Sequence, residues 1–194
     1  MKRLSSITLL LISFLMSATF AQTTFKANEN TEVKVTGTST LHDWHANVKE
    51  TKAEGVMIVT GNGLTALTSL KVSMKVESMD TGEKMMDKNL YKALKSEANP
   101  YITYKLKEVK SITPSSGGYS LNTLGTLTIA GITKTVNLTV KAKVNTDGSV
   151  TFTGSHKLDM VEYQVEPPVA VFGTIKTGKD VTIEFKLTLS QIAS

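Results

Sequence analysis

Cysteine is absent from the 194 residues of this chain. Disulfide bonds and thiolate chemistry are therefore excluded, although a chain without cysteine is compatible with an oxidising compartment. No serine stands in a nucleophile-elbow pattern, and no glycine-rich loop leads into a helical segment. The motifs of common hydrolases and nucleotide-binding enzymes are thus missing, and we predict neither a catalytic residue nor a cofactor.

Long hydrophobic runs are also scarce, because the only one covers residues 4–16. Lys2 and Arg3 precede it and Thr19-Phe20-Ala21 follows it, which is the pattern of a secretory signal peptide with cleavage near Ala21. The run is shorter than the roughly 20 apolar residues of a membrane-spanning helix. We expect residues 1–21 to be a signal peptide and the mature protein to be periplasmic or secreted; an uncleaved N-terminal anchor is the alternative.

An excess of charge of one sign is missing from the remaining 173 residues, 22–194, which are enough for one domain with a core. Without Lys2 and Arg3, 20 of the 22 basic side chains remain against 17 acidic ones, a net charge of +3. This bias is too small for a nucleic-acid-binding protein. We therefore expect no nucleic-acid partner.

Period-two alternation of apolar and polar residues dominates the domain. It is clearest in residues 181–189 and recurs in residues 136–144, 70–76 and 102–106. This pattern indicates strands with one buried and one wet face. Turn sequences such as Asp147-Gly148 separate these runs. The number and length of the runs predict an all-β fold, an antiparallel barrel of about eight strands.

One segment, residues 82–95, departs from this period, because Met86, Leu90 and Leu94 recur at helical spacing. Asp80 and Glu83 suit a capping box at its start. The sequence therefore predicts one amphipathic helix that covers or plugs a mouth of the barrel.

Four lysines follow one side of this helix: Lys84, Lys88, Lys92 and Lys95. They suit either a solvated face or contact with anionic headgroups. Transient contact with a membrane surface stays open on this pattern, and a homodimer is a further open expectation.

The cluster His42-Asp43-Trp44-His45 is the densest group of functional residue types. On a strand, His42 and His45 would point to opposite faces and could not share a metal ion, whereas His42 and Trp44 would share a face. We therefore predict no metal site, and expect one of the two histidines to serve a structural or pocket role beside Trp44. His156 stands alone on an expected strand, where a solvated or hydrogen-bonded histidine is the ordinary outcome.

The inward-facing set of the expected barrel is mostly Val, Leu, Ile and Met, with only 6% aromatic residues in the chain. An eight-stranded barrel has room either for its own side chains or for one small ligand. The pattern alone therefore leaves three functions open: a protein that binds an apolar ligand, a ligand-free structural stress protein with a filled barrel, and a metal-dependent or redox-linked enzyme using His42, Asp43 and His45.

Four stretches of the chain resemble the YceI-like, polyisoprenoid-binding family. They are residues 37–44, residues 84–94 with 99–104, residues 125–134, and residues 158–160 with Pro167-Pro168 and Gly173. The resemblance implies a lipocalin-like barrel whose long internal pocket takes an isoprenoid, a fatty amide or another amphiphilic lipid.

In such a pocket Leu127 and Ile129 would face inward, and Leu90 and Leu94 would close the cavity. Tyr104 and Tyr163 each stand where a Phe is common in the family, so the ligand preference can differ. The residues that we expect to contact the lipid are His42, Trp44, Val72, Met74, Val76, Met86, Leu90, Tyr91, Leu94, Ile102, Tyr104, Leu106, Leu127, Ile129, Leu138 and Phe185.

Overall fold

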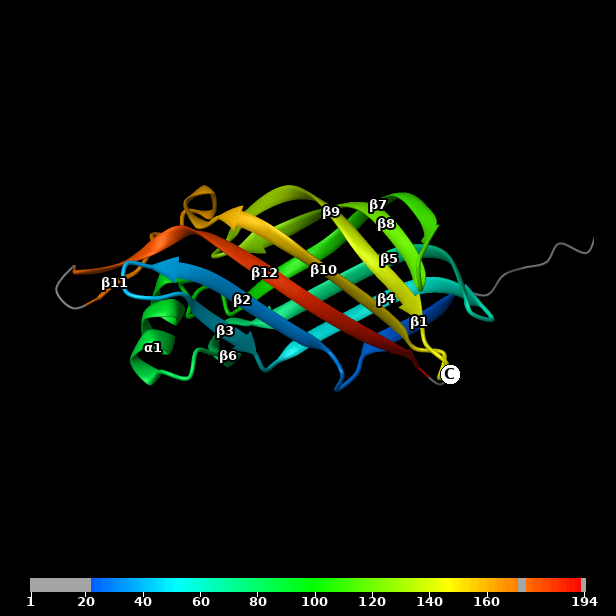
Figure 1. The fold of residues 1–194 in the computed structure, drawn as a ribbon, viewed down its shortest axis with the longest axis horizontal. Coiled ribbons are helices and arrows are strands. Elements are labelled where there is room, and N and C mark those ends of the chain that lie inside the picture. Colours follow the sequence, from blue (N-terminus) through cyan, green and yellow to red (C-terminus); the bar gives the residue numbers. More distant parts are fainter. Residues whose placement is uncertain (1–21, 171–173, 193–194) are drawn as a thin grey trace, which may run out of the picture.

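A computed structural model describes residues 22–170 and 174–192 of the chain (Figure 1). The expected signal peptide and Gly173 lie outside the described residues. Within those residues, no helix has the length and hydrophobicity needed to cross a membrane.

The described residues form strands, one α-helix and two short 3-10 helices. The elements are β1 (Thr23–Ala27), β2 (Glu32–Ser39), β3 (Trp44–Val48), β4 (Thr51–Thr60), β5 (Gly63–Lys75), η1 (Val76–Ser78), β6 (Met79–Asp80), α1 (Lys84–Ala93), β7 (Tyr101–Ser115), β8 (Gly118–Ile129), β9 (Ile132–Val144), β10 (Val150–Asp159), η2 (Met160–Tyr163), β11 (Val169–Ala170) and β12 (Ile175–Gln191).

The sheet closes into a barrel of eight long staves. β1 and β2 both pair antiparallel with β12, and β4 and β3 pair with β1 and β2 respectively. β1–β2 and β3–β4 therefore each act as one interrupted strand. The remaining staves are β5, β7, β8, β9, β10 and β12, each antiparallel to its neighbour. The predicted antiparallel barrel of about eight strands is confirmed.

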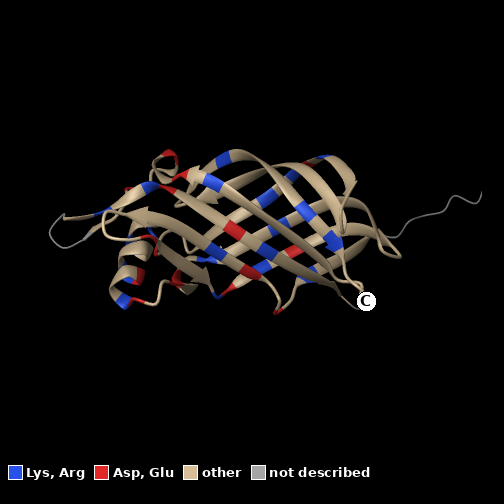
Figure 2. Ribbon diagram, in the orientation of Figure 1, with Lys and Arg blue, Asp and Glu red and all other residues tan. Residues whose placement is uncertain are grey.

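Alternation along the strands sets which side chains enter the barrel. In β12, Val181, Ile183 and Leu187 are buried, whereas Glu184 and Lys186 are exposed on the outer wall. Because successive side chains of a strand point to opposite faces, each stave contributes every second residue to the interior. Along the strands that Figure 2 shows, basic and acidic residues are interspersed.

The two ends of the barrel differ. At the end that carries the β9–β10 hairpin, the interior is filled by side chains that are almost fully buried: Phe25, Met57, Leu121, Val150 and Leu189. At the opposite end, α1 lies beside β3, β6 and β11 (Figure 1).

The helix is shorter than predicted and starts differently. The capping box of Asp80 and Glu83 is wrong, because Glu83 is itself the N-cap and its side chain makes no capping hydrogen bond. Asp80 instead accepts a hydrogen bond from the Gly82 amide at 2.9 Å, and Asp87 accepts two from Thr81, from its amide at 2.9 Å and from its hydroxyl at 2.7 Å. Gly82 has a φ of +84°, outside the right-handed helical region, so the helix begins only after it, at Lys84.

Candidate functional site: an apolar lumen beneath helix α1

Two adjoining cavities follow the barrel axis. The outer cavity lies beneath α1 and has a volume of about 330 Å³, and the inner one lies deeper and has a volume of about 70 Å³. Ile183 of β12 lines both cavities, so they are neighbours on either side of this residue.

The outer cavity is walled by helix and strands together. Met86, Leu90 and Leu94 face it from α1, while Ile102 and Ile129 face it from β7 and β8. The helical spacing of the α1 residues explains why one side of this short helix can close the barrel.

The rim of the outer cavity is partly apolar and exposed. Leu41, Met85 and Val169 line it with 66%, 71% and 59% of their surfaces accessible. Few side chains of this size are so exposed among the described residues. His42 and Glu83 add polar groups to the same rim.

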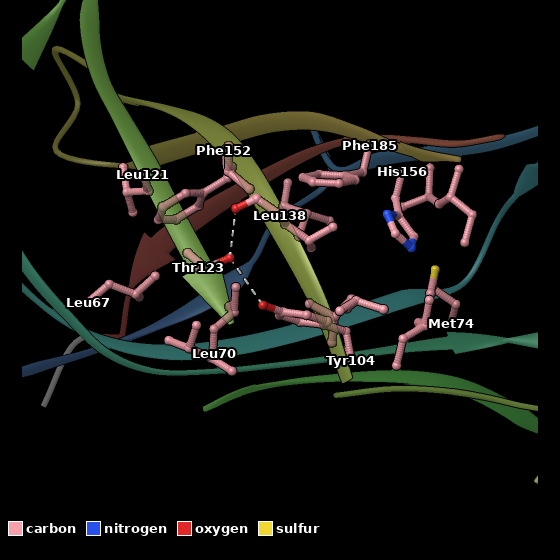
Figure 3. Close-up of a pocket in the computed structure, with 18 residues that line it drawn as sticks. Leu67, Leu70, Met74, Tyr104, Leu121, Thr123, Leu138, Phe152, His156 and Phe185 are labelled. Atoms are coloured by element: carbon pink, nitrogen blue, oxygen red, sulfur yellow. Dashed lines mark hydrogen bonds between the residues drawn. The ribbon is translucent and has the colours of Figure 1, made fainter. Parts of the chain in front are cut away.

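The inner cavity is lined by Val, Leu, Ile, Met and Phe side chains from most staves (Figure 3). Of the residues that the structure describes, three polar ones face it: Tyr104, Thr123 and His156. No carboxylate, lysine or arginine lines it among the described residues. A charged ligand group would find no counter-charge here.

The hydroxyls of Tyr104 and Thr123 are both engaged in hydrogen bonds within the barrel. The Thr123 hydroxyl donates to the carbonyl of Leu138 at 3.2 Å, so the Tyr104 hydroxyl is left to donate to Thr123 Oγ1 at 3.4 Å (Figure 3). Burial raises the pKa of Tyr104, which keeps its hydroxyl protonated. This pair therefore adds no ionic chemistry to the lumen.

Three inward-facing glycines each support an aromatic ring of the neighbouring strand. A Cβ at Gly125 would lie 2.4 Å from Cε2 of Tyr104, and one at Gly154 would lie 2.7 Å from Cζ of Phe185. At Gly37 the same atom would lie 2.5 Å from Cζ2 of Trp44. Because glycine has no side chain, each ring can lie flat on the barrel wall instead of crossing the lumen.

Most of the residues expected from the sequence do face these cavities. Val72, Met74, Tyr104, Leu106, Leu127, Leu138 and Phe185 line the inner cavity, and His42, Trp44, Met86, Leu90, Leu94, Ile102 and Ile129 line the outer one. Whether they contact a lipid stays a prediction.

Val76 and Tyr91 are exceptions, because the structure places them outside both linings. Val76 belongs to η1, where the strand alternation of β5 has ended, and its amide donates to the Pro100 carbonyl at 2.9 Å. The Tyr91 hydroxyl donates to the Met79 carbonyl at 2.7 Å and ties α1 to β6.

The sequence reasoning missed part of the lining. Leu67, Leu70, Leu121, Phe152 and His156 face the inner cavity. The same alternation could have found Leu121, Phe152 and His156, which stand on long regular strands. Irregular pairing of β4 with β5 between Val56 and Val59 shifts the pattern near Leu67.

The cluster around His42 spans the end of a loop and the start of a strand: His42 and Asp43 lie in the loop between β2 and β3, whereas Trp44 and His45 begin β3. His42 Nδ1 donates to the Asp43 carbonyl at 2.8 Å, and His45 is exposed on the outer wall of β3. Among the described residues, no group of three or more His, Cys, Asp or Glu side chains could hold a metal ion. Trp44 lines the outer cavity and donates its indole N–H to the Thr38 carbonyl at 3.1 Å.

Solved structures with this architecture include BcnA of Burkholderia cenocepacia, with a TM-score of 0.66 and 20% identity over 82% of this chain and 96% of that one. A polyisoprenoid-binding domain from Saccharophagus degradans, implicated in plant cell wall breakdown, has a TM-score of 0.66 and 10% identity over 89% of this chain and all of that one. The YceI protein of Campylobacter jejuni gives a TM-score of 0.57 and 18% identity over 77% of this chain and 85% of that one. At these identities the likeness shows a shared fold.

Among curated proteins none matches the chain. The model of the YceI-like domain matches residues 44–189, which is about three-quarters of the sequence. It covers the barrel from β3 into β12 and leaves out β1 and β2. The chain therefore belongs to the YceI-like domain family.

Proposed function

We propose that this protein is a non-catalytic carrier that holds one long-chain apolar or amphiphilic lipid, of isoprenoid or fatty-amide type, inside its barrel. The observation that carries the proposal is the apolar interior of the barrel, which holds an outer cavity beneath α1 and a deeper inner cavity, with Ile183 lining both. Pockets for small molecules in proteins usually measure about 300–1,000 Å³. The outer cavity falls in that range, and the inner cavity extends it along the barrel axis.

The chemistry of the lining supports a lipid chain as the occupant. Each methylene that leaves water for an apolar site gains about 0.8 kcal/mol. A chain of about ten methylenes would thus gain roughly 8 kcal/mol, before the entropy cost of association is subtracted. The Saccharophagus degradans domain of the same fold is a polyisoprenoid-binding domain, which agrees with this choice of ligand.

In this proposal the protein acts outside the cytoplasm, in the periplasm or as a secreted protein. It rests on the cationic start, apolar run and small-residue cleavage site of residues 1–21. The exposed apolar rim formed by Leu41, Met85 and Val169 supports transient contact with a membrane surface, because a lipid could pass from bilayer to lumen without crossing water.

Native mass spectrometry of mature protein from its own host tests the proposal directly. We expect a fraction of the protein to carry a lipid, and delipidated protein to take up an added polyprenyl lipid. A variant with Leu127→Trp and Ile129→Trp should lose this occupancy, because both side chains line the lumen.

Thr126→Trp and Thr128→Trp form the matched control on the outer face of the same strand, and this variant should keep the lipid. Circular dichroism would establish that both variants are folded. A wild-type protein that never carries a lipid and ignores added polyprenyl lipids would refute the proposal.

A further inference from the structure

His156 is the polar side chain of the inner cavity that has no partner in the described structure. It extends from β10 into the lumen, and Met74 of β5 points into the same space from the opposite wall (Figure 3). Tyr104 and Thr123 are engaged in the chain of hydrogen bonds that ends at the Leu138 carbonyl. No described residue donates to or accepts from the His156 imidazole. The side chain is half-buried, and if a ligand enclosed it without offering a partner, the lost hydrogen bond to water would cost about 1–3 kcal/mol.

His156 also lies where a bound chain must pass. Its partner across the β10–β12 ladder is Ile183, which lines both cavities. Leu158, two residues further along β10, lines the outer cavity. Since a strand rises about 3.4 Å per residue, His156 lies about 7 Å from Leu158 along β10, on the side of the inner cavity. A lipid that fills the outer cavity and continues inward therefore reaches the imidazole.

The surroundings define the charge of the group that the imidazole would meet. The titratable side chains of the inner cavity are His156 and Tyr104, and neither is an acid or a base of fixed charge at neutral pH. Burial lowers the pKa of His156, so the ring is neutral and offers one N–H donor and one nitrogen acceptor. A neutral hydroxyl, carbonyl or amide can pair with such a ring, whereas a carboxylate or phosphate would be left without a counter-charge.

We propose that His156 is a hydrogen-bonding site inside the barrel for an uncharged polar group of the ligand, and that the apolar chain of the ligand runs from there out through the outer cavity. This inference rests on the proposed lipid-binding function. It specifies the ligand class further, as an amphiphile whose hydroxyl, carbonyl or amide group is buried in the lumen instead of exposed at the mouth.

Farnesol and farnesene provide a matched pair of probes, an isoprenoid alcohol and the corresponding hydrocarbon. The single tryptophan, Trp44, lines the outer cavity and reports binding by its fluorescence. For delipidated wild-type protein we expect farnesol to bind about three- to tenfold more tightly than farnesene, the gain from one hydrogen bond. His156→Leu should abolish this preference by weakening farnesol binding, and His156→Gln should restore part of it because an amide still donates and accepts.

His45→Gln is the control, because His45 is exposed on the outer wall and should leave the preference unchanged. Nitrogen chemical shifts of the His156 ring, measured by NMR, should change with farnesol and stay unchanged with farnesene. An equal farnesol-to-farnesene affinity ratio in wild type and His156→Leu would overturn the inference while leaving lipid binding intact. If neither probe nor any added polyprenyl lipid bound the wild type, the proposed function itself would fail.

Discussion

Replacing Gly125 with alanine tests whether glycine keeps the lumen open. The new Cβ would lie 2.4 Å from Cε2 of Tyr104 and 2.5 Å from its Cζ and hydroxyl oxygen, whereas ordinary contacts begin at 3.4 Å. The ring would have to retreat by at least about 1 Å. Since Gly125 is part of the wall, the retreat is directed toward the inner cavity, which measures only about 70 Å³.

The energetic cost follows from three contributions. Overpacking of this kind costs about 1–3 kcal/mol. Moving the ring also stretches the hydrogen bond from Tyr104 to Thr123, which is already 3.4 Å long and contributes about 1 kcal/mol. Alanine regains about 0.5–1 kcal/mol relative to glycine in a strand. We expect Gly125→Ala to lower the free energy of unfolding by about 1–3.5 kcal/mol.

Urea denaturation in a double-mutant cycle measures this cost. Tyr104→Leu removes the ring, so Gly125→Ala should be nearly neutral in that background, with a coupling energy of about 1–3 kcal/mol. The affinity for lipids that reach the inner cavity should fall in Gly125→Ala, while a short amphiphile confined to the outer cavity should bind as before. If Gly125→Ala lowered the free energy of unfolding equally in both backgrounds, the clash between its Cβ and the Tyr104 ring would not be the cause of the cost.

Three further predictions concern the histidine, the helix and the rim. The pKa of His156 is lowered in the folded state, so the unfolded chain binds the extra proton first; stability should fall as pH drops from about 6.5 toward the folded pKa, with a slope of at most about 1.4 kcal/mol per pH unit. Urea unfolding against pH should show this slope in wild type and lose it in His156→Gln; identical profiles would contradict the assignment. Tyr91→Phe removes the donor to the Met79 carbonyl and should cost about 1 kcal/mol, with faster amide hydrogen exchange in α1 and unchanged exchange in β8. Uniformly faster exchange would mean that the bond does not hold the helix locally. Met85→Lys with Leu41→Lys should slow lipid uptake from vesicles by at least about fivefold, because each wild-type side chain can gain roughly 1 kcal/mol or more on entering a bilayer. An unchanged uptake rate would refute the proposed contact between this rim and the membrane.

Much of the fold was predictable because it depends on local patterns. The alternation of residues 181–189 predicts that the side chains of Val181, Ile183 and Leu187 point from β12 into the barrel, where they are buried. The same rule orients Leu127 and Ile129 toward the lumen. Strand alternation has a period of two residues, so one correct strand boundary fixes the facing of every side chain along it. Eight such staves leave few arrangements other than a closed barrel.

The differences between prediction and structure lie where regular pairing stops. The alternation of residues 70–76 predicts Val76 in the lumen, but the chain enters η1 at that residue. Tyr91 is expected to contact the lipid, yet it lies outside both cavity linings and its hydroxyl donates to the Met79 carbonyl. The predicted start of the helix is also wrong. The Asp80 side chain accepts a hydrogen bond from the Gly82 amide in a turn with a positive φ at Gly82, so it does not cap the helix. In each case, a local hydrogen bond or turn overrides the periodic pattern.

The sequence alone could not distinguish a hollow barrel from a filled one, because alternation determines the direction of a side chain and not the volume left between opposite walls. The inward-facing glycines supply part of the missing information. Gly125 and Gly154 stand at lumen positions where a larger residue would fill space, and each allows Tyr104 or Phe185 to lie along the wall. Glycine at an inward position of a strand sacrifices apolar burial and backbone entropy, so its presence indicates a space that another group occupies. Here the neighbouring ring takes part of that space, and the remainder is the lumen in which the imidazole of His156 is still without a partner.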